Sequence, residues 1–115
     1  MIDELKKYKK IIEDAVDLLG YTPLRYAIFE GEKNNRIEYQ VRIEYIENHY
    51  EVYTTGERAS ISGKKQFENF FEAYHNFLFK LQLSILQNRR RVRDGEPPEY
   101  FCALWELSLI HISDG

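Results

Sequence analysis

The stretch "RIEYQVRIEYI", residues 36–46, shows the strictest alternation of apolar and polar residues in the chain. In an extended strand, one face carries Ile37, Tyr39, Val41, Ile43 and Tyr45, and the other carries Arg36, Glu38, Gln40, Arg42 and Glu44. This pattern is typical of a strand with one buried and one solvated face. We therefore expect a sheet that exposes a polar face to solvent.

Further strands are predicted on both sides of this stretch. "LRYAIFE", residues 24–30, precedes it and is separated from it by the loop-like "GEKNN". "HYEVYTT", residues 49–55, follows after a short turn at 47–48, and "RASIS", residues 58–62, is expected to form a short fourth strand. Such short connections favour an antiparallel meander.

Two helices are predicted to flank the strands. Residues 3–19 place Leu5, Tyr8, Ile12, Ala15 and Leu19 at helical spacing before Gly20, which ends the helix. Asn69 is a good N-cap for a second helix that runs to about Arg91. Its inward stripe is expected to be Phe71, Tyr74, Leu78, Leu81 and Ile85, supplemented by Phe70 and Phe77. The predicted fold class is α+β, a single domain over residues 1–106 in the order α-β-β-β-(β)-α, with an antiparallel meander sheet and both helices packed on one face.

The end of the chain, residues 107–115, needs a separate interpretation. "LSLIHI" reads codon by codon like a translation of the transposon mosaic end used in sequencing-library preparation. We expect a non-native tail there, which implies a metagenomic or draft-assembly source. His111 is given no function.

Composition narrows the classes of protein. The net charge is −3, yet residues 11–57 carry ten acids against four bases, whereas "NRRRVR", residues 88–93, carries four arginines. No apolar run is long enough to cross a bilayer, and the lysine-rich start has no signal-peptide core, so we expect a cytoplasmic protein that does not contact a membrane. A single cysteine, Cys102, excludes an internal disulfide.

Motifs for catalysis are not found. Gly56 to Lys64 lacks the spacing of a phosphate-binding loop. Glu72 and His75 have a Glu-x-x-His spacing, but a di-iron site needs a second copy and more carboxylates. His49 stands beside a turn with no visible catalytic partner. We therefore predict no catalytic residue, no metal, no cofactor and no small-molecule substrate; the protein is not expected to be an enzyme.

Two kinds of macromolecular binding remain open. The element order, with "SGKK" before the second helix, has the outline of a double-stranded RNA-binding domain, but the acidic middle would repel a polyanion, so nucleic acid is not the favoured partner. The polar sheet face could instead contact a protein. A face that only solubilises the sheet would show the same alternation. A small enzyme with a site between sheet and helix is the third alternative.

The segment from residue 20 to 83 resembles the bacterial polymorphic-toxin immunity proteins of immunity protein family 59. The resemblance is carried by a strand ending in Val-Tyr, a Glu-Arg turn and a phenylalanine-rich helix start. The matching residues are Val52, Tyr53, Glu57, Arg58, Phe67, Asn69, Glu72, Ala73, Phe77 and Leu78.

This resemblance implies a cytoplasmic protein that binds a cognate secreted toxin and neutralises it by stoichiometric contact. From strand alternation and the turn, the expected contact residues are Glu38, Gln40, Arg42, Glu44, Glu51, Tyr53 and Glu57. Arg58 is expected to pair across the strand ends. No role is carried onto Arg89 to Arg93, which lie beyond the recognised pattern.

Overall fold

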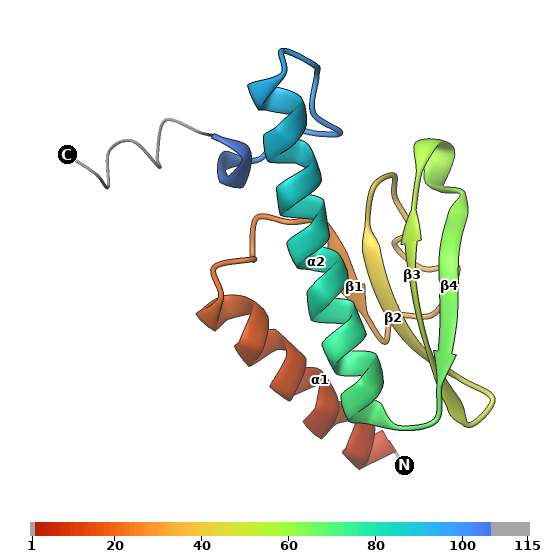
Figure 1. Cartoon of the computed structure of the whole chain (residues 1–115). Coiled ribbons are helices and arrows are strands. Elements are labelled where there is room, and N and C mark those ends of the chain that lie inside the picture. The colour runs from red at the N-terminus through yellow and green to blue at the C-terminus, as the bar shows by residue number, and fades with distance from the viewer. Residues whose placement is uncertain (1, 107–115) are drawn as a thin grey trace.

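The structure is a computed structural model that describes residues 2–106, in which two helices pack against one face of a four-stranded sheet (Figure 1). The elements are α1 (Ile2–Leu18), β1 (Tyr26–Ile28), β2 (Val41–Ile46), β3 (His49–Thr55), β4 (Ile61–Phe67) and α2 (Phe70–Arg93), with 3-10 turns at Glu57–Ala59 and Ala103–Trp105. The predicted α+β class and element order are confirmed. The tail prediction for residues 107–115 lies outside the described residues.

The sheet has the order β1-β2-β3-β4, and its first pairing differs from the prediction. Strands β2, β3 and β4 pair antiparallel, but β1 pairs parallel to β2, with Tyr26 opposite Val41. The all-antiparallel meander is therefore wrong at this edge. The physical reason is that the residues between β1 and β2 do not form a hairpin: they pass over the polar face of the sheet.

Strand β2 is also shorter than predicted, because residues 36–40 are not extended. Tyr39 has a positive φ of 56°, which interrupts a strand. The turn between β2 and β3 is as expected, since Glu47 and Asn48 both have positive φ, as a two-residue turn between twisted strands requires. β4 begins later than the predicted strand 58–62 and extends further, because Glu57–Ala59 forms a 3-10 turn.

The helices bury their apolar stripes against the sheet. The core contains Ile12 and Val16 of α1, Ile43 and Val52 of the sheet, and Phe70, Ala73, Phe77, Leu81 and Ile85 of α2. The α1 ring of Tyr8 stacks on Phe70 of α2, with ring centroids 3.8 Å apart. Leu19 and Phe71 were predicted to face inward but are exposed: Leu19 lies past the end of α1, and Phe71 lies at the flank of the α2 stripe.

The start of α2 is capped as predicted. The side-chain oxygen of Asn69 accepts hydrogen bonds from the backbone amides of Phe71 and Glu72, at 2.7 and 3.3 Å. These bonds satisfy two of the amides that a helix start leaves without an intrahelical partner. The helix ends at Arg93, two residues later than predicted.

The chain after α2 folds back against the helix. Asn88 is fully buried, accepts a hydrogen bond from the backbone N–H of Glu99 at 2.7 Å and donates one to the Glu99 carboxylate at 3.0 Å. The hydroxyl of Tyr100 accepts a hydrogen bond from the backbone N–H of Arg25, just before β1. The C-terminal segment thus connects α2 to the β1 side of the fold.

Within residues 2–106, none of the helices has the combination of length and apolar character that spanning a bilayer requires.

Candidate protein-binding surface

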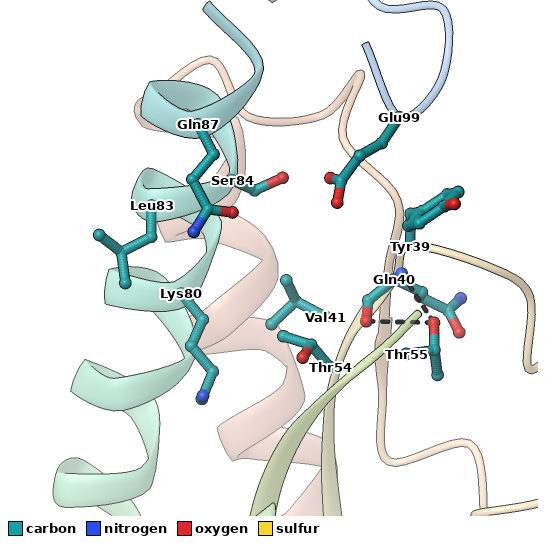
Figure 2. Close-up of a pocket in the computed structure, with 10 residues that line it drawn as sticks. All are labelled: Tyr39, Gln40, Val41, Thr54, Thr55, Lys80, Leu83, Ser84, Gln87 and Glu99. Atoms are coloured by element: carbon teal, nitrogen blue, oxygen red, sulfur yellow. Dashed lines mark hydrogen bonds between the residues drawn. The ribbon is translucent and has the colours of Figure 1, made fainter. Parts of the chain in front are cut away.

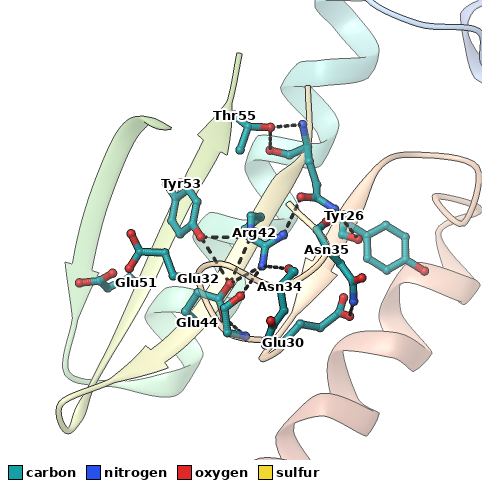
Figure 3. A network of polar contacts seen from close by, with 12 residues as sticks. Tyr26, Glu30, Glu32, Asn34, Asn35, Arg42, Glu44, Glu51, Tyr53 and Thr55 are labelled. Atoms are coloured by element: carbon teal, nitrogen blue, oxygen red, sulfur yellow. Dashed lines mark hydrogen bonds and ion pairs between the residues drawn. The ribbon is translucent and has the colours of Figure 1, made fainter. Parts of the chain in front are cut away.

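The polar face of the sheet is covered by the chain's own loop (Figure 3). Arg42 of β2, which is 0% exposed, lies between the sheet and this loop. Its guanidinium donates hydrogen bonds to the backbone oxygens of Gly31 and Asn34 at 2.7 and 2.8 Å, and to the Glu44 carboxylate at 2.9 Å. Tyr53 also meets the guanidinium, with its hydroxyl 3.0 Å from Nε. The loop between β1 and β2 is therefore held onto the sheet by one buried cation.

The expected exposure of the polar face is wrong for five of the seven predicted contact residues. Those buried are Gln40, Arg42, Glu44, Glu51 and Tyr53. Alternation correctly separates the two faces of the strands, but it does not reveal that a loop covers the second face. Glu38 and Glu57 are exposed, at the ends of the strands. The structure thus gathers five of the candidates in an interior network and leaves two at the surface.

Arg58 was expected to form an ion pair across the strand ends. Among residues 2–106 it forms none. Instead, its backbone N–H donates a hydrogen bond to the Glu38 carboxylate at 3.1 Å. Arg58 has a positive φ of 57°, so this bond supports a sharp turn after β3. The Glu-Arg turn therefore serves architecture through its backbone.

A second charge cluster lies beside this network, at the far end of the same face. Nε2 of His49 lies 2.9 Å from the Glu51 carboxylate, and Nζ of Lys64 lies 3.3 Å from Glu51 and 3.4 Å from Glu32. The hydrogen bond to Glu51 raises the pKa of His49. Burial alone would raise the pKa of Glu51, but the hydrogen bonds from His49 and Lys64 outweigh burial and lower it.

His49 therefore has an ion-pair partner in Glu51, which sequence reasoning did not identify. Because the Glu51 carboxylate is shared with Lys64, the cluster has the character of a structural ion pair. His75, which was considered with Glu72 as a possible metal ligand, is exposed on α2. Among the residues that the structure describes, no three His, Cys, Asp or Glu side chains come close enough to hold a metal ion.

The opposite face of the sheet carries a groove where α2 meets β2 and β3 (Figure 2). Its volume is about 200 Å³, and it is lined by Tyr39, Gln40, Val41, Thr54, Thr55, Lys80, Leu83, Ser84, Gln87 and Glu99. We call it the α2 groove. Small-molecule pockets generally have volumes of roughly 300–1,000 Å³, so this groove is better matched to a single side chain than to a substrate.

The two ends of the α2 groove differ in charge. At one end, burial raises the pKa of Tyr39, and the negative charges of Glu57, Glu38 and Glu99 raise it further. At the other end, burial lowers the pKa of Lys80, and the positive charge of Lys65 lowers it further. Lys80 and Glu99 extend from opposite ends of the groove in Figure 2.

Sequence reasoning missed the lysine end of this groove. Lys65 lies opposite Val52 in the β3–β4 pairing, and Val52 belongs to the core beneath α2. Lys80 follows Phe79 on α2, three residues after the buried Phe77. The signal that could have found it is a lysine on the flank of an apolar helix stripe, together with a lysine in phase with the apolar residues of a strand.

The likeness to the outline of a double-stranded RNA-binding domain loses its main support in the structure. Lys64 and Lys65 lie within β4 and not at the start of α2, and Lys64 is engaged by two carboxylates. Two of the arginines near the end of α2 are engaged as well: Arg89 donates to the backbone oxygen of Leu104 at 2.8 Å, and Arg93 pairs with Asp94.

Comparison with known proteins matches the chain to a protein family. The family model described as Immunity protein 59 matches residues 5–106, which extends the resemblance from residues 20–83 to both helices and the C-terminal segment. No curated protein and no solved structure matches the chain.

Proposed function

Since the chain belongs to the immunity protein 59 family, we propose that it binds a cognate bacterial toxin and neutralises it in a stoichiometric complex. The match over residues 5–106 is the observation that supports this function, because it includes every helix and strand that holds the groove-bearing surface. The proposal includes residence in the bacterial cytoplasm and a polymorphic toxin system as the source of the partner.

The proposed mechanism is occlusion. The immunity protein covers the toxin's active site or holds a mobile element of it, and no turnover is needed. Specific interfaces obtain most of their affinity from a few desolvated anchors, and charges at the rim guide the encounter. Glu38 and Glu57 remain proposed contacts because both are exposed beside the α2 groove.

The five buried candidates are given a different part in the same function. Gln40, Arg42, Glu44, Glu51 and Tyr53 hold the loop and the strands in place. They would contact a partner only if the loop between β1 and β2 left the sheet. We therefore propose that they support the binding surface and do not form it.

The experiment is a test of protection and stoichiometry. We expect the gene of the toxin immediately upstream of this one, so the partner to use is the C-terminal domain of a secreted protein encoded there. Co-expression should restore growth of cells that produce this toxin domain, and calorimetry should give a complex of one immunity protein per toxin domain. Growth arrest in spite of soluble immunity protein, together with no heat of binding, would refute the proposed function.

A further inference from the structure

The lysine end of the α2 groove contains positive charge that the fold does not neutralise. Within residues 2–106, the ion pairs involve neither Lys65 nor Lys80. Lys80 reaches from α2 to β4, since a Cβ on Gly63 would lie 3.5 Å from its Nζ. Lys65 projects from β4 towards the same helix, and its charge acts on Lys80. The charge of the exposed Lys65 thus acts on a Lys80 that is itself partly desolvated.

This arrangement costs stability in the isolated protein. A partly buried ammonium loses hydration, and a neighbouring like charge adds repulsion. Glutamine or methionine at position 80 would avoid both costs while keeping most of the length of the side chain. The adjacent Lys64 shows the usual solution, because it turns to the other face and meets Glu32 and Glu51. An unfavourable charge at a concave surface is a recognised mark of a functional site.

Apolar side chains lie directly beside this charge. Phe79 and Leu86 of α2 are each 54% exposed, and the half-buried Leu83 lies between them at helical spacing. We call Phe79, Leu83 and Leu86 the apolar stripe. Interfaces combine such apolar anchors with a small number of charges that fix the register of the partner. The stripe and Lys80 meet at the groove, since Leu83 and Lys80 both line it.

We propose that the lysine end of the α2 groove receives a carboxylate side chain of the toxin, while apolar side chains next to that carboxylate pack on the apolar stripe. This inference rests on the proposed function and adds the surface and the chemistry of the contact. The occupant is a toxin side chain because the groove has the volume of one side chain, and it is a carboxylate because the unneutralised charge at the lysine end is positive.

The first test uses the isolated protein. Lys80→Met should raise the midpoint of thermal unfolding by about 1–3 °C, because a charge without a partner is removed. Lys64→Met is the matched control in the neighbouring strand and should lower the midpoint, because it breaks two ion pairs. A lower midpoint for Lys80→Met would show that Lys80 has a stabilising partner in the free protein, and would overturn the proposal.

The second test uses the complex with the upstream-encoded toxin domain. Lys80→Glu should weaken binding by about 10-fold or more, whereas Lys80→Arg should keep most of the affinity. Lys6→Glu on the exposed face of α1 is the control for an equal change of net charge and should bind as wild type. Carbodiimide should cross-link Lys80 to a toxin Asp or Glu, and this cross-link should disappear in Lys80→Arg, whose guanidinium does not form the amide.

The outcomes separate the two proposals. Wild-type protein that neither binds nor protects would overturn the proposed function, and this inference with it. Wild-type protein that protects, with Lys80→Glu equal to Lys6→Glu, would overturn the inference alone. Salt-sensitive retention of the wild type on duplex RNA that Lys80→Glu abolishes, without an effect on toxin binding, would assign the lysines to phosphate and also overturn it.

Discussion

The two faces of the sheet differ in whether their positively charged side chains form ion pairs. On the loop-covered face, Arg42 and Lys64 meet the carboxylates of Glu44, Glu51 and Glu32. On the helix face, neither Lys65 nor Lys80 forms an ion pair within the described residues, and the charge of Lys65 lowers the pKa of Lys80. The paired charges hold the loop and the strands together, whereas Lys80, which is unpaired within residues 2–106, lines a groove. The contrast separates residues that build the surface from residues that are available to a partner.

The largest loss of stability is expected from removing the buried cation of the loop-covered face. Arg42→Met leaves the Glu44 carboxylate and the loop carbonyls buried without their donor, so it should lower the free energy of unfolding by about 3–5 kcal/mol. Arg36→Met, on the exposed part of the same connection, should change it by less than about 0.5 kcal/mol. Urea unfolding followed by circular dichroism measures both. Equal stabilities for the two variants would contradict the assigned role of Arg42.

A combined variant sharpens the same comparison. Replacing a whole buried ionic network by apolar residues is often tolerated, whereas removing one member is costly. Arg42→Met combined with Glu44→Leu and Tyr53→Phe should therefore be more stable than Arg42→Met alone. A triple variant less stable than the single one would mean that the network contributes net stability as a unit.

The second-largest loss of stability is expected where residues 99–106 pack against the end of α2. Asn88→Ala removes the acceptor for the Glu99 amide and should lower the free energy of unfolding by about 1–3 kcal/mol. Amide hydrogen exchange should accelerate in residues 99–106 more than in β2 and β3. Exchange that rises equally in all elements would show that the segment does not open as a local unit.

The smallest effect is expected from pH acting on the His49–Glu51 pair. The raised pKa of His49 means that its contribution to stability is fully present below its ordinary pKa of 6.5 and is lost as the pH rises through the raised value. The lowered pKa of Glu51 gives the opposite limit: its contribution is present above 4.5 and is lost as the pH falls through the lowered value. The pair should therefore stabilise the protein most between these limits.

His49→Gln tests this pH dependence. Urea midpoints of the wild type should fall between about pH 6 and 8, and the variant should show a flatter profile over this range. His75→Gln, on the exposed face of α2, is the control and should leave the profile of the wild type unchanged. Identical profiles for wild type and His49→Gln would show that the pair is not formed in solution.

Local patterns were sufficient to predict most of the fold. Helical spacing and the Asn69 cap located both helices, and strict alternation located the faces of β2 and β3. What alternation could not predict was the path of the chain between β1 and β2. The parallel pairing of β1 goes together with a connection that crosses the sheet and binds Arg42, and these contacts are distant from any local signal.

The same lack of a local signal explains why most of the candidate contact residues were expected at the surface. A buried arginine and an exposed one have the same place in an alternating pattern, so Arg42 was expected at the surface. Burial of Arg42 depends on carbonyl oxygens of Gly31 and Asn34, which the sequence does not distinguish from other loop carbonyls. Likewise, Lys64 and Lys65 lie beyond the predicted strand 58–62, and their place within β4 sends them to opposite faces of the sheet.

The most direct measurement compares one substitution on the two faces. Calorimetric titration of the upstream-encoded toxin domain should give a dissociation constant for Lys64→Met close to that of the wild type, because Lys64 serves the covered face. Lys80→Met should give a dissociation constant about 10-fold larger. Wild-type affinity in Lys80→Met, with a loss in Lys64→Met, would contradict the account and move the binding surface to the other side of the sheet.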